Sequence, residues 1–456
     1  MSSERIVCAE CTRADLMRAT AGRGLPTIEP GMPLPAGTGL TRRRFLARSA
    51  GLALAVYGAQ NLGLFNSQFY DEGIANAATG GKGPILVSVF MQGGADSLSL
   101  LYPQGDPLYA KLRADLAVTG GTAFTEDSRL FWHPALSPLA QLHDEGKVSV
   151  FPAIGYDHPD QSHFTSRHYW EVGATDPRLL TGWMGRYLDV VGVADNPLQG
   201  LSITGSLEPS LATAKVPVAA IDGPNQYTFN TQGVWGSVSD RMLDAVGALG
   251  SVKSHDPAFK TAANVTAQSD RLRRQLLPFA GDKMTSPVTY PDGNVGFVTG
   301  LQGVAAMIAA GLPLHCVALE ASGSYDTHAD QASALNDGLN VTGPALYAFQ
   351  RDLEARGVAD RVLTLVWSEF GRRAEENGSG GTDHGAAGTA FLMGTRAAGV
   401  QVGEFPGLDS LDADGNLKPT SDFRSVYSSL LEQWLKFDAA RVIPDAGKFT
   451  RYQLVK

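Results

Sequence analysis

Cysteine is scarce in this sequence, which has three in 456 residues. Cys8 and Cys11 stand close to the start of the chain, and Cys316 follows much later in an apolar run. No internal disulfide can therefore stabilise the main part of the chain, and Cys316 is expected to be a buried thiol in the core. The C-x-x-C pair has no second pair and no histidine beside it, so it does not by itself make a zinc site. The fold must rest on apolar packing.

Positive charge is also in short supply. The chain has 37 Lys and Arg against 46 Asp and Glu, which gives a net charge of −9 and a pI near 5.5. No basic stripe interrupts this balance, which argues against a nucleic-acid-binding protein. The remaining composition, with 43% hydrophobic and 18% charged residues, is typical of a globular protein, and 52 Gly and 25 Pro predict many loops.

Long apolar runs are absent as well, and this bears on the start of the chain. Residues Thr41–Leu46 read T-R-R-R-F-L, which fits a twin-arginine export signal. The segment that follows, to about Leu64, is too polar for a membrane span of about 20 apolar residues. Residues 75–77 read A-N-A, a cleavage pattern. We expect an export leader over residues 1–77, cleaved near Ala77, and a mature form without a stable membrane span.

This leader implies that the twin-arginine translocase is a partner of the chain. The mature protein is then expected in the periplasm, in the cell envelope or outside the cell. The alternative is a leader that is not cleaved and remains as a membrane anchor.

Apolar runs that do not alternate with polar residues predict strands buried on both faces. The predicted strands are Pro84–Met91, Val148–Ile154, Val216–Ile221, Leu314–Leu319, Val362–Trp367 and Thr389–Gly394. Helical patterns lie between and after them: His133–Glu145, Thr181–Leu188, Ser239–Leu249, Val265–Leu277, Gly303–Gly311, Pro344–Arg356 and Phe423–Leu435. This alternation predicts an α/β fold with a doubly wound, mostly parallel sheet flanked by helices. We expect one domain over residues 82–456, with an irregular insertion around 190–300.

Acidic, imidazole and hydroxyl side chains follow several of these strands. The carboxyl ends of parallel strands meet at one edge of a sheet, so such groups can converge although they are far apart in sequence. Carboxylates and neutral imidazoles are ligands of divalent metals, with zinc, manganese, calcium and magnesium all open. For any single position the alternative is an ordinary turn, and the recurrence favours a site. The predicted metal ligands are Asp96, Asp326, His328, Glu369, Asp383 and His384.

Two further residues are predicted to take part in catalysis. Ser162 stands near the first turn of a helix, where backbone N–H groups and the helix dipole favour an anion. Its hydroxyl could therefore lie beside a bound anion, and helix capping is the alternative use of such a serine. Arg372 would hold the anionic oxygens of a substrate, and a surface salt bridge is its alternative role.

Several longer motifs follow in order from about Pro84 to Leu435: F-M-Q-G-G-A-D-S, S-H-F, T-G-W-x-G-R-Y-L, Y-D-T-H, W-S-E-F-G-R-R, G-G-T-D-H-G and S-D-F-R-S-V-Y. In these the chain resembles a bacterial family of twin-arginine-exported proteins, the domain of unknown function 1501. That family is related to the alkaline phosphatase and sulfatase superfamily. The resemblance implies an alkaline-phosphatase-like fold.

The resemblance also assigns roles to single residues. It places Asp96 at the metal position of the first strand and Ser162 at the nucleophile position. It implies that Asp326 and His328 form one metal-binding pair, and that His384 is a later metal histidine. The superfamily pattern has an Asp-His pair after the late strand, where this chain has Glu369-Phe370.

We therefore expect an exported metal-dependent hydrolase that acts on a small anionic phosphate or sulfate ester. The alternative is a non-catalytic exported binding or assembly protein with a degenerate alkaline-phosphatase-like site. The Glu369-Phe370 departure favours the alternative, because it removes one histidine unless Asp383 and His384 substitute for it.

Overall fold

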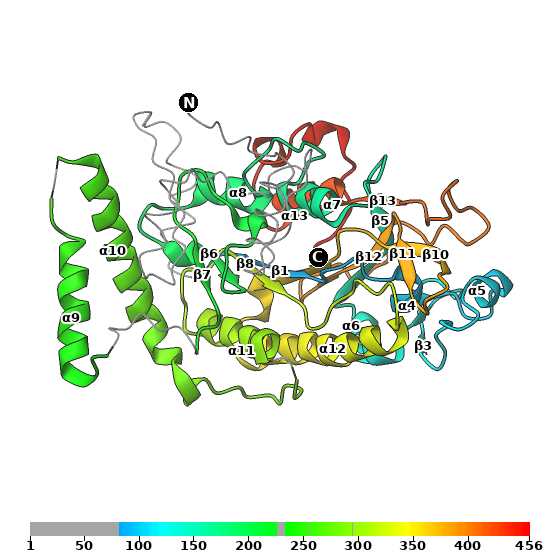
Figure 1. The fold of residues 1–456 in the computed structure, drawn as a ribbon, viewed down its shortest axis with the longest axis horizontal. Helices are drawn as coiled ribbons and strands as arrows, with labels where there is room; N and C mark the ends of the chain where they lie inside the picture. Colours follow the sequence, from blue (N-terminus) through cyan, green and yellow to red (C-terminus); the bar gives the residue numbers. More distant parts are fainter. Residues whose placement is uncertain (1–81, 226–232, 254, 294) are drawn as a thin grey trace, which may run out of the picture.

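The computed structural model describes residues 82–225, 233–253, 255–293 and 295–456 (Figure 1). The predicted leader over residues 1–77, its cleavage site and Cys8 and Cys11 lie outside these residues. Among the described helices, none is long and apolar enough to cross a lipid bilayer.

The largest sheet in the described part of the chain has eight strands in the order β13-β5-β12-β9-β1-β8-β6-β7. Its strands are β1 Ile85–Phe90, β5 Val148–Gly155, β6 Gly200–Ile203, β7 Ala219–Ile221, β8 Cys316–Glu320, β9 Val362–Trp367, β12 Gly388–Met393 and β13 Ser421–Asp422. Neighbouring strands run parallel except at β12, which is antiparallel to β5 and β9. The expected doubly wound, mostly parallel sheet is confirmed.

Two smaller sheets flank this one. Strand β10 (Arg372–Glu376) pairs with β11 (Thr382–His384) as an antiparallel hairpin between β9 and β12. The other small sheet joins β2 (Leu101–Tyr102), β4 (Phe131–Trp132) and β3 (Thr122–Ala123).

Helices cover both faces of the large sheet (Figure 1). On one face pack α6 (Ser137–Asp144), α11 (Val295–Ala309) and α12 (Gln331–Ala355). On the other face pack α7 (His163–Val172), α8 (Trp183–Val191) and α13 (Phe423–Gln433). The short helices α4 (Ser97–Leu100) and α5 (Pro107–Leu112) follow β1. The remaining pair, α9 (Gly236–Leu249) and α10 (Pro257–Leu276), projects from the edge of the molecule near β6 and β7.

Strand β1 shows why the apolar run of the sequence does not alternate. Ile85, Val87 and Val89 enter the core on one side of the sheet, while Leu86 and Phe90 enter the core on the other. Successive side chains of a strand point to opposite faces, so a strand covered on both faces needs apolar residues at nearly every position. The one polar residue of β1, Ser88, is buried and accepts a hydrogen bond from Trp367 Nε1 at 2.9 Å. Each such side chain contributes about 1.5–3 kcal/mol when it is fully buried.

Three helices begin earlier than predicted: α10 begins at Pro257 where Val265 was expected, α11 at Val295 where Gly303 was expected, and α12 as follows. Helix α12 begins at Gln331 and contains Pro344, although Pro344 was expected to start the helix. The segment before this proline contains glycine and asparagine, which favour helix poorly, but buried Leu335 and Leu339 hold it against the core. The segment around 190–300 supplies β6 and β7 to the large sheet, and β7 lies within the predicted strand Val216–Ile221.

Candidate metal centre

The predicted convergence at one sheet edge is present in the structure. Strands β1, β5, β8 and β9 are mutually parallel, so their carboxyl ends share an edge. The chain leaves β9 at this edge, forms the β10–β11 hairpin above it and enters β12 from the same side. This path explains why β12 is antiparallel, and it places Asp383 and His384 beside the loop that follows β8.

Four side chains meet at this edge, and we call them the metal cluster: His163, Asp326, His328 and His384. Asp326 Oδ1 lies 3.4 Å from Nε2 of His163, 3.2 Å from Nε2 of His328 and 3.6 Å from Nε2 of His384. The Nε2 atoms of His328 and His384 are 2.9 Å apart. Zinc–nitrogen bonds of about 2.0–2.1 Å place tetrahedral donors roughly 3.3–3.4 Å apart. Each of the three Nε2 atoms therefore lies at about the spacing of a neighbouring ligand from Asp326 Oδ1.

Each imidazole of the metal cluster is held through its other nitrogen. The contacts are His163 Nδ1 to Glu369 Oε1 at 2.8 Å, His328 Nδ1 to Asp383 Oδ1 at 3.2 Å, and His384 Nδ1 to the Gln161 carbonyl at 2.7 Å. A carbonyl or an ionised carboxylate can only accept, so each Nδ1 carries the proton and donates it. The lone pair of every Nε2 then remains available, as metal-binding histidines require.

His163 Nε2 supports this assignment independently. The atom is buried and has no hydrogen-bond partner among the described residues. An unpaired buried acceptor is costly, and a bound ion would satisfy it. His163, Asp326 and His384 also have donor atoms within 4.8 Å of one another. The residues present fit a divalent metal.

Glu369 supports the metal cluster from below. Its buried carboxylate accepts hydrogen bonds from the backbone amides of Gly93 and Gly94 and from Ser368 Oγ, in addition to that of His163. Burial opposes its ionisation, but the bond and charge of His163 and the amide of Gly94 keep the pKa of Glu369 below its ordinary value. Because both of its oxygens are engaged in this way, Glu369 is not free to bind a metal itself, and its role is to orient His163 of the metal cluster.

The glycines at this position are required by geometry. Gly93 has φ +116°, and a Cβ there would lie 2.3 Å from the backbone nitrogen of Asp326. Gly94 has φ +69°, and a Cβ there would lie 2.3 Å from the Phe370 ring. Only glycine lets the loop after β1 pass this close to the loops that follow β8 and β9.

Helix α7 delivers His163 as its first residue. Trp170 of this helix stacks on Trp367 at 5.3 Å and on Phe423 at 4.7 Å between ring centroids, which fixes the helix against the sheet and α13. Ser162 occupies the cap position, but its side chain makes no capping hydrogen bond. The serine stands between Gln161 and His163, which both take part in the site.

Arg372 lies beneath the loops and is fully buried. Its guanidinium donates to the carbonyls of Gly93, Gly94 and Thr382 and, at 2.6 Å, to Asp326 Oδ1. Burial raises the pKa of Asp326, but the hydrogen bond from Arg372 outweighs it, so this pKa is lowered. The structure thus shows Arg372 binding three loops together, and its predicted contact with a substrate stays a prediction.

Asp96 is not brought into the metal cluster. Its carboxylate points into the core, where Arg113 donates to both oxygens at 2.6 and 2.9 Å and Ser99 and Gln331 donate to Oδ2. Burial opposes ionisation, but Arg113 holds the pKa of Asp96 below its ordinary value. Helix α4 starts directly after this residue and turns its side chain away from the sheet edge.

His163 was not selected from the sequence, although it lies within the polar segment that follows β5. The residue beside it, Ser162, was chosen because the family resemblance pointed to a nucleophile there. A signal was present, since the first residue of a helix at the carboxyl end of a strand lies near other strand ends.

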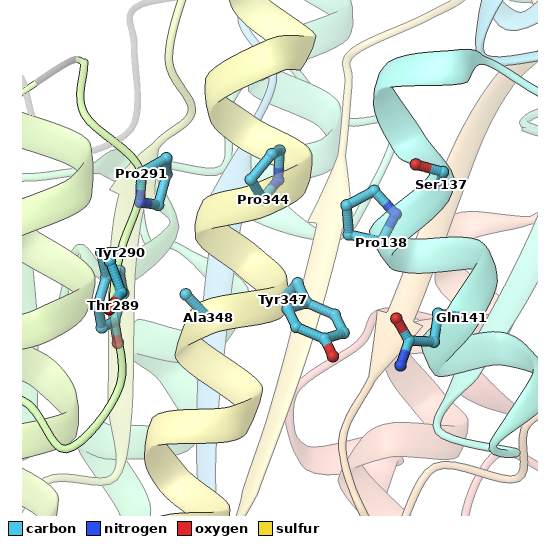
Figure 2. Close-up of a pocket in the computed structure, with 9 residues that line it drawn as sticks. All are labelled: Ser137, Pro138, Gln141, Thr289, Tyr290, Pro291, Pro344, Tyr347 and Ala348. Atoms are coloured by element: carbon cyan, nitrogen blue, oxygen red, sulfur yellow. The ribbon is translucent and has the colours of Figure 1, made fainter.

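One groove of the described residues lies away from the metal cluster. A groove of about 540 Å³ is lined by nine residues from α6, α12 and the segment before α11 (Figure 2). Figure 2 shows Tyr347 and Pro344 of α12 beside Pro138 and Gln141 of α6. None of the nine belongs to the metal cluster, so this groove is unrelated to it.

Several solved structures are similar to the chain. A protein in the alkaline phosphatase superfamily from Vibrio parahaemolyticus has 9% identity and a TM-score of 0.33, covering 96% of this chain and 76% of that one. The PsFucS1 sulfatase from Pseudoalteromonas sp. has 12% identity and a TM-score of 0.32, with 85% and 78% covered. The C-terminal periplasmic domain of EcEptC from Escherichia coli has 10% identity and a TM-score of 0.34, with 80% and 87% covered. At these values the similarities say nothing about function.

No curated protein matches the sequence. Residues 158–445 match the family described as "Protein of unknown function (DUF1501)". The match spans more than half of the 456 residues and includes His163, Asp326, His328 and His384. The chain therefore belongs to the DUF1501 family.

Proposed function

We propose that the metal cluster binds one divalent ion and that the chain is a metal-dependent hydrolase of phosphate or sulfate esters. The observation that carries this proposal is the convergence of three imidazole Nε2 atoms and Asp326 Oδ1, with every Nδ1 engaged elsewhere. Three unprotonated imidazole nitrogens gathered around one carboxylate oxygen repel that oxygen, and a bound cation would relieve this repulsion.

Zinc is the ion that suits this donor set best. Three imidazoles and one carboxylate are typical zinc ligands, whereas calcium and magnesium prefer sites made of oxygen. A bound ion of this kind supplies Lewis-acid polarisation and lowers the pKa of a coordinated oxygen.

Ser162 is the residue of the chain that we assign to attack on the ester. It is half-buried, its side chain caps nothing, and both of its neighbours contact or belong to the site. The first backbone N–H groups of α7 lie beside it and are suited to hold anionic oxygens. Asp160 fixes the turn by accepting from the Ser162 amide at 2.8 Å.

A second function has one specific observation in its favour. Arg372 is buried among carbonyls, and Arg167 is paired with Glu171, Glu208 and Glu320. These two arginines are therefore engaged within the chain, where an anionic ester would need an accessible positive group. This favours a non-catalytic exported protein that binds a metal or assembles with a partner.

Export through the twin-arginine translocase is part of the same proposal. That route carries folded proteins, so the ion can be inserted before the chain leaves the cytoplasm. Detection of the chain in the periplasm, in the cell envelope or outside the cell, and its loss from there when Arg42 and Arg43 are replaced by lysine, tests this proposal.

Metal analysis separates these functions. We expect about one zinc per purified wild-type chain, a lower content in His163→Ala and His384→Ala, and an unchanged content in His255→Ala, whose side chain is exposed and outside the cluster. Turnover of aryl phosphate and aryl sulfate esters by the wild type, lost in Ser162→Ala with zinc retained, supports the hydrolase. Zinc binding without serine-dependent turnover supports the binding protein. A chain that binds no divalent ion refutes the metal-dependent hydrolase and leaves the assembly protein.

A further inference from the structure

Two of the segments that supply the metal cluster also carry a buried threonine. Thr327 stands between Asp326 and His328 in the motif Y-D-T-H. Thr382 stands two residues before His384 in the motif G-G-T-D-H-G. The two threonines are 3% and 0% exposed, and neither belongs to the metal cluster. Because a buried hydroxyl group needs a hydrogen-bond partner, another side chain must accept from each of them.

Both hydroxyl groups donate to one atom, the side-chain oxygen of Gln331. Thr327 Oγ1 lies 2.9 Å from Gln331 Oε1, and Thr382 Oγ1 lies 2.5 Å from the same atom. An amide oxygen has two lone pairs, so one glutamine can serve both threonines. Gln331 is the first residue of α12 and is 1% exposed. Its side chain therefore joins the loop that follows β8 to strand β11 in the interior of the protein.

Asp96 fixes the direction in which the Gln331 amide points. Gln331 Nε2 donates to Asp96 Oδ2 at 2.7 Å. Although burial opposes ionisation, Arg113 holds the pKa of Asp96 below its ordinary value, and an ionised carboxylate can only accept hydrogen bonds. The amide nitrogen of Gln331 must therefore face Asp96, which leaves the amide oxygen to face the threonines. Asp96 follows β1 without reaching the metal cluster, and this contact gives it a place in the support of the cluster.

Two backbone hydrogen bonds run beside these side-chain contacts. The Thr382 amide donates to the Thr327 carbonyl at 3.0 Å, and the Gln331 amide donates to the Gly380 carbonyl at 2.9 Å. The two segments are thus joined directly beside three members of the metal cluster. The separation between His328 and His384, whose Nε2 atoms are 2.9 Å apart, depends on this junction.

We propose that Gln331 is a positioning residue, which holds the segment Asp326–His328 and strand β11 at the separation that the metal cluster needs. Its side chain contacts Thr327, Thr382 and Asp96, and none of these supplies a donor atom to the cluster. This role rests on the proposed binding of an ion by the metal cluster, but not on hydrolysis. If Gln331 served only the stability of the fold, its loss would lower stability and leave metal affinity unchanged.

Replacing Gln331 by methionine removes both hydrogen-bonding groups at nearly constant size. We expect zinc affinity, measured by titration against a competing chelator, to fall about 10–100-fold, with a changed visible absorption spectrum of the cobalt-substituted chain. Gln350→Met is the matched control, because Gln350 is also a buried glutamine of α12, with side-chain hydrogen bonds to Glu354 and Thr395. It lies about 28 Å further along the helix and should lose stability without losing zinc affinity. Wild-type zinc affinity in Gln331→Met, or an equal loss in Gln350→Met, overturns the proposal.

A milder pair of variants tests the same contact from the side of strand β11. Thr382→Val removes the hydroxyl group at nearly constant shape, whereas Thr382→Ser keeps a hydroxyl group that can donate to Gln331. We expect zinc affinity to fall about tenfold in Thr382→Val and to stay near the wild-type value in Thr382→Ser. Equal zinc affinity in the two variants would contradict the role of the hydrogen bond.

Hydrogen exchange of the zinc-free chain tests the junction without a metal. Relative to the amides of β1, the amides at positions 331 and 382 are expected to exchange about tenfold faster in Gln331→Met than in the wild type, and at the wild-type rate in Gln350→Met. Unchanged exchange at both positions refutes the positioning role. A wild type that binds no zinc counts against the metal-dependent hydrolase, and hydrogen exchange then decides the role of Gln331 by itself.

Discussion

Glutamine in place of Glu369 removes one buried negative charge beneath the metal cluster and keeps the shape of the side chain. In the wild type, Oε1 accepts from His163 Nδ1 at 2.8 Å, and the carboxylate also accepts the amides of Gly93 and Gly94. The amide group has one acceptor oxygen in place of two. The single amide oxygen can accept from the Gly93 and Gly94 amides or from His163 Nδ1, and the donor that it does not reach is left without an acceptor.

The size of the effect depends on whether His163 or the two glycine amides lose their acceptor. Removing a partner that orients a metal-binding histidine costs about 10–100-fold in metal affinity, or about 1.4–2.7 kcal/mol. If the glycine amides are left unpaired instead, the free energy of unfolding falls by about 1–3 kcal/mol. Asp383→Asn removes the equivalent partner of His328, but that side chain is 51% exposed and water can replace it. We therefore expect a loss of zinc affinity below tenfold in Asp383→Asn.

Zinc affinity is best measured by titration against a competing chelator at fixed pH, together with thermal unfolding of the metal-free chain. The expected order of affinity is wild type, then Asp383→Asn, then Glu369→Gln. Equal affinity of the wild type and Glu369→Gln, with equal thermal stability, would refute the role of the carboxylate. A larger loss in Asp383→Asn than in Glu369→Gln would refute the argument from burial.

Three further predictions concern stability. Burial raises the pKa of Glu171 from an ordinary 4.5 to about 7, so the protonated form that suits the folded state is lost as pH rises through 7. The free energy of unfolding should therefore fall by about 3 kcal/mol at most between pH 4.5 and 8. In urea titrations at several pH values, Glu171→Gln should show a weaker pH dependence than the wild type. Gly93→Ala should destabilise by more than about 3 kcal/mol and weaken zinc binding, because the methyl group meets backbone, whereas Gly105→Ala, with φ +83° and open space, should cost about 1 kcal/mol. Arg113→Leu leaves the buried Asp96 carboxylate without its cation and should lower the free energy of unfolding by about 3–5 kcal/mol in denaturant titrations. The zinc content should stay unchanged, because Asp96 lies outside the metal cluster. A loss of bound zinc would contradict this and indicate that Asp96 is a metal ligand.

The sheet could be predicted because strands buried on both faces leave a plain signal, the unbroken apolar run. The run Val362–Trp367 was predicted at its observed bounds. Strand direction was less accessible, since apolar pattern does not encode direction. The antiparallel course of β12 follows from the β10–β11 hairpin, and that hairpin has only short, polar strands.

The site could be predicted to the level of the sheet edge, and less well at the level of single residues. Asp326, His328 and His384 do come together as donors. Asp96 and Glu369 follow strands in the same way, yet one turns to Arg113 and the other to His163. The sequence shows that a carboxylate leaves a strand end, but it does not show the partner, which is 17 positions away for Asp96 and 206 positions away for Glu369.

The partner of the Asp326 carboxylate, Arg372 or the metal ion, distinguishes the two proposed functions. Its Oδ1 lies 2.6 Å from Arg372 Nη2 and within 3.6 Å of all three imidazole Nε2 atoms. If Asp326 stays with Arg372, the three histidines would hold the ion and a position would remain for substrate, as in catalytic zinc sites; if Asp326 turns to the ion, it would be the fourth protein ligand. Moving Asp326 would leave the buried guanidinium with its carbonyl partners alone, and because Asp326 is 43% exposed, water offsets part of the loss and the cost is about 1–3 kcal/mol. The cost of unpairing Arg372 therefore favours the open site, and with it the hydrolase.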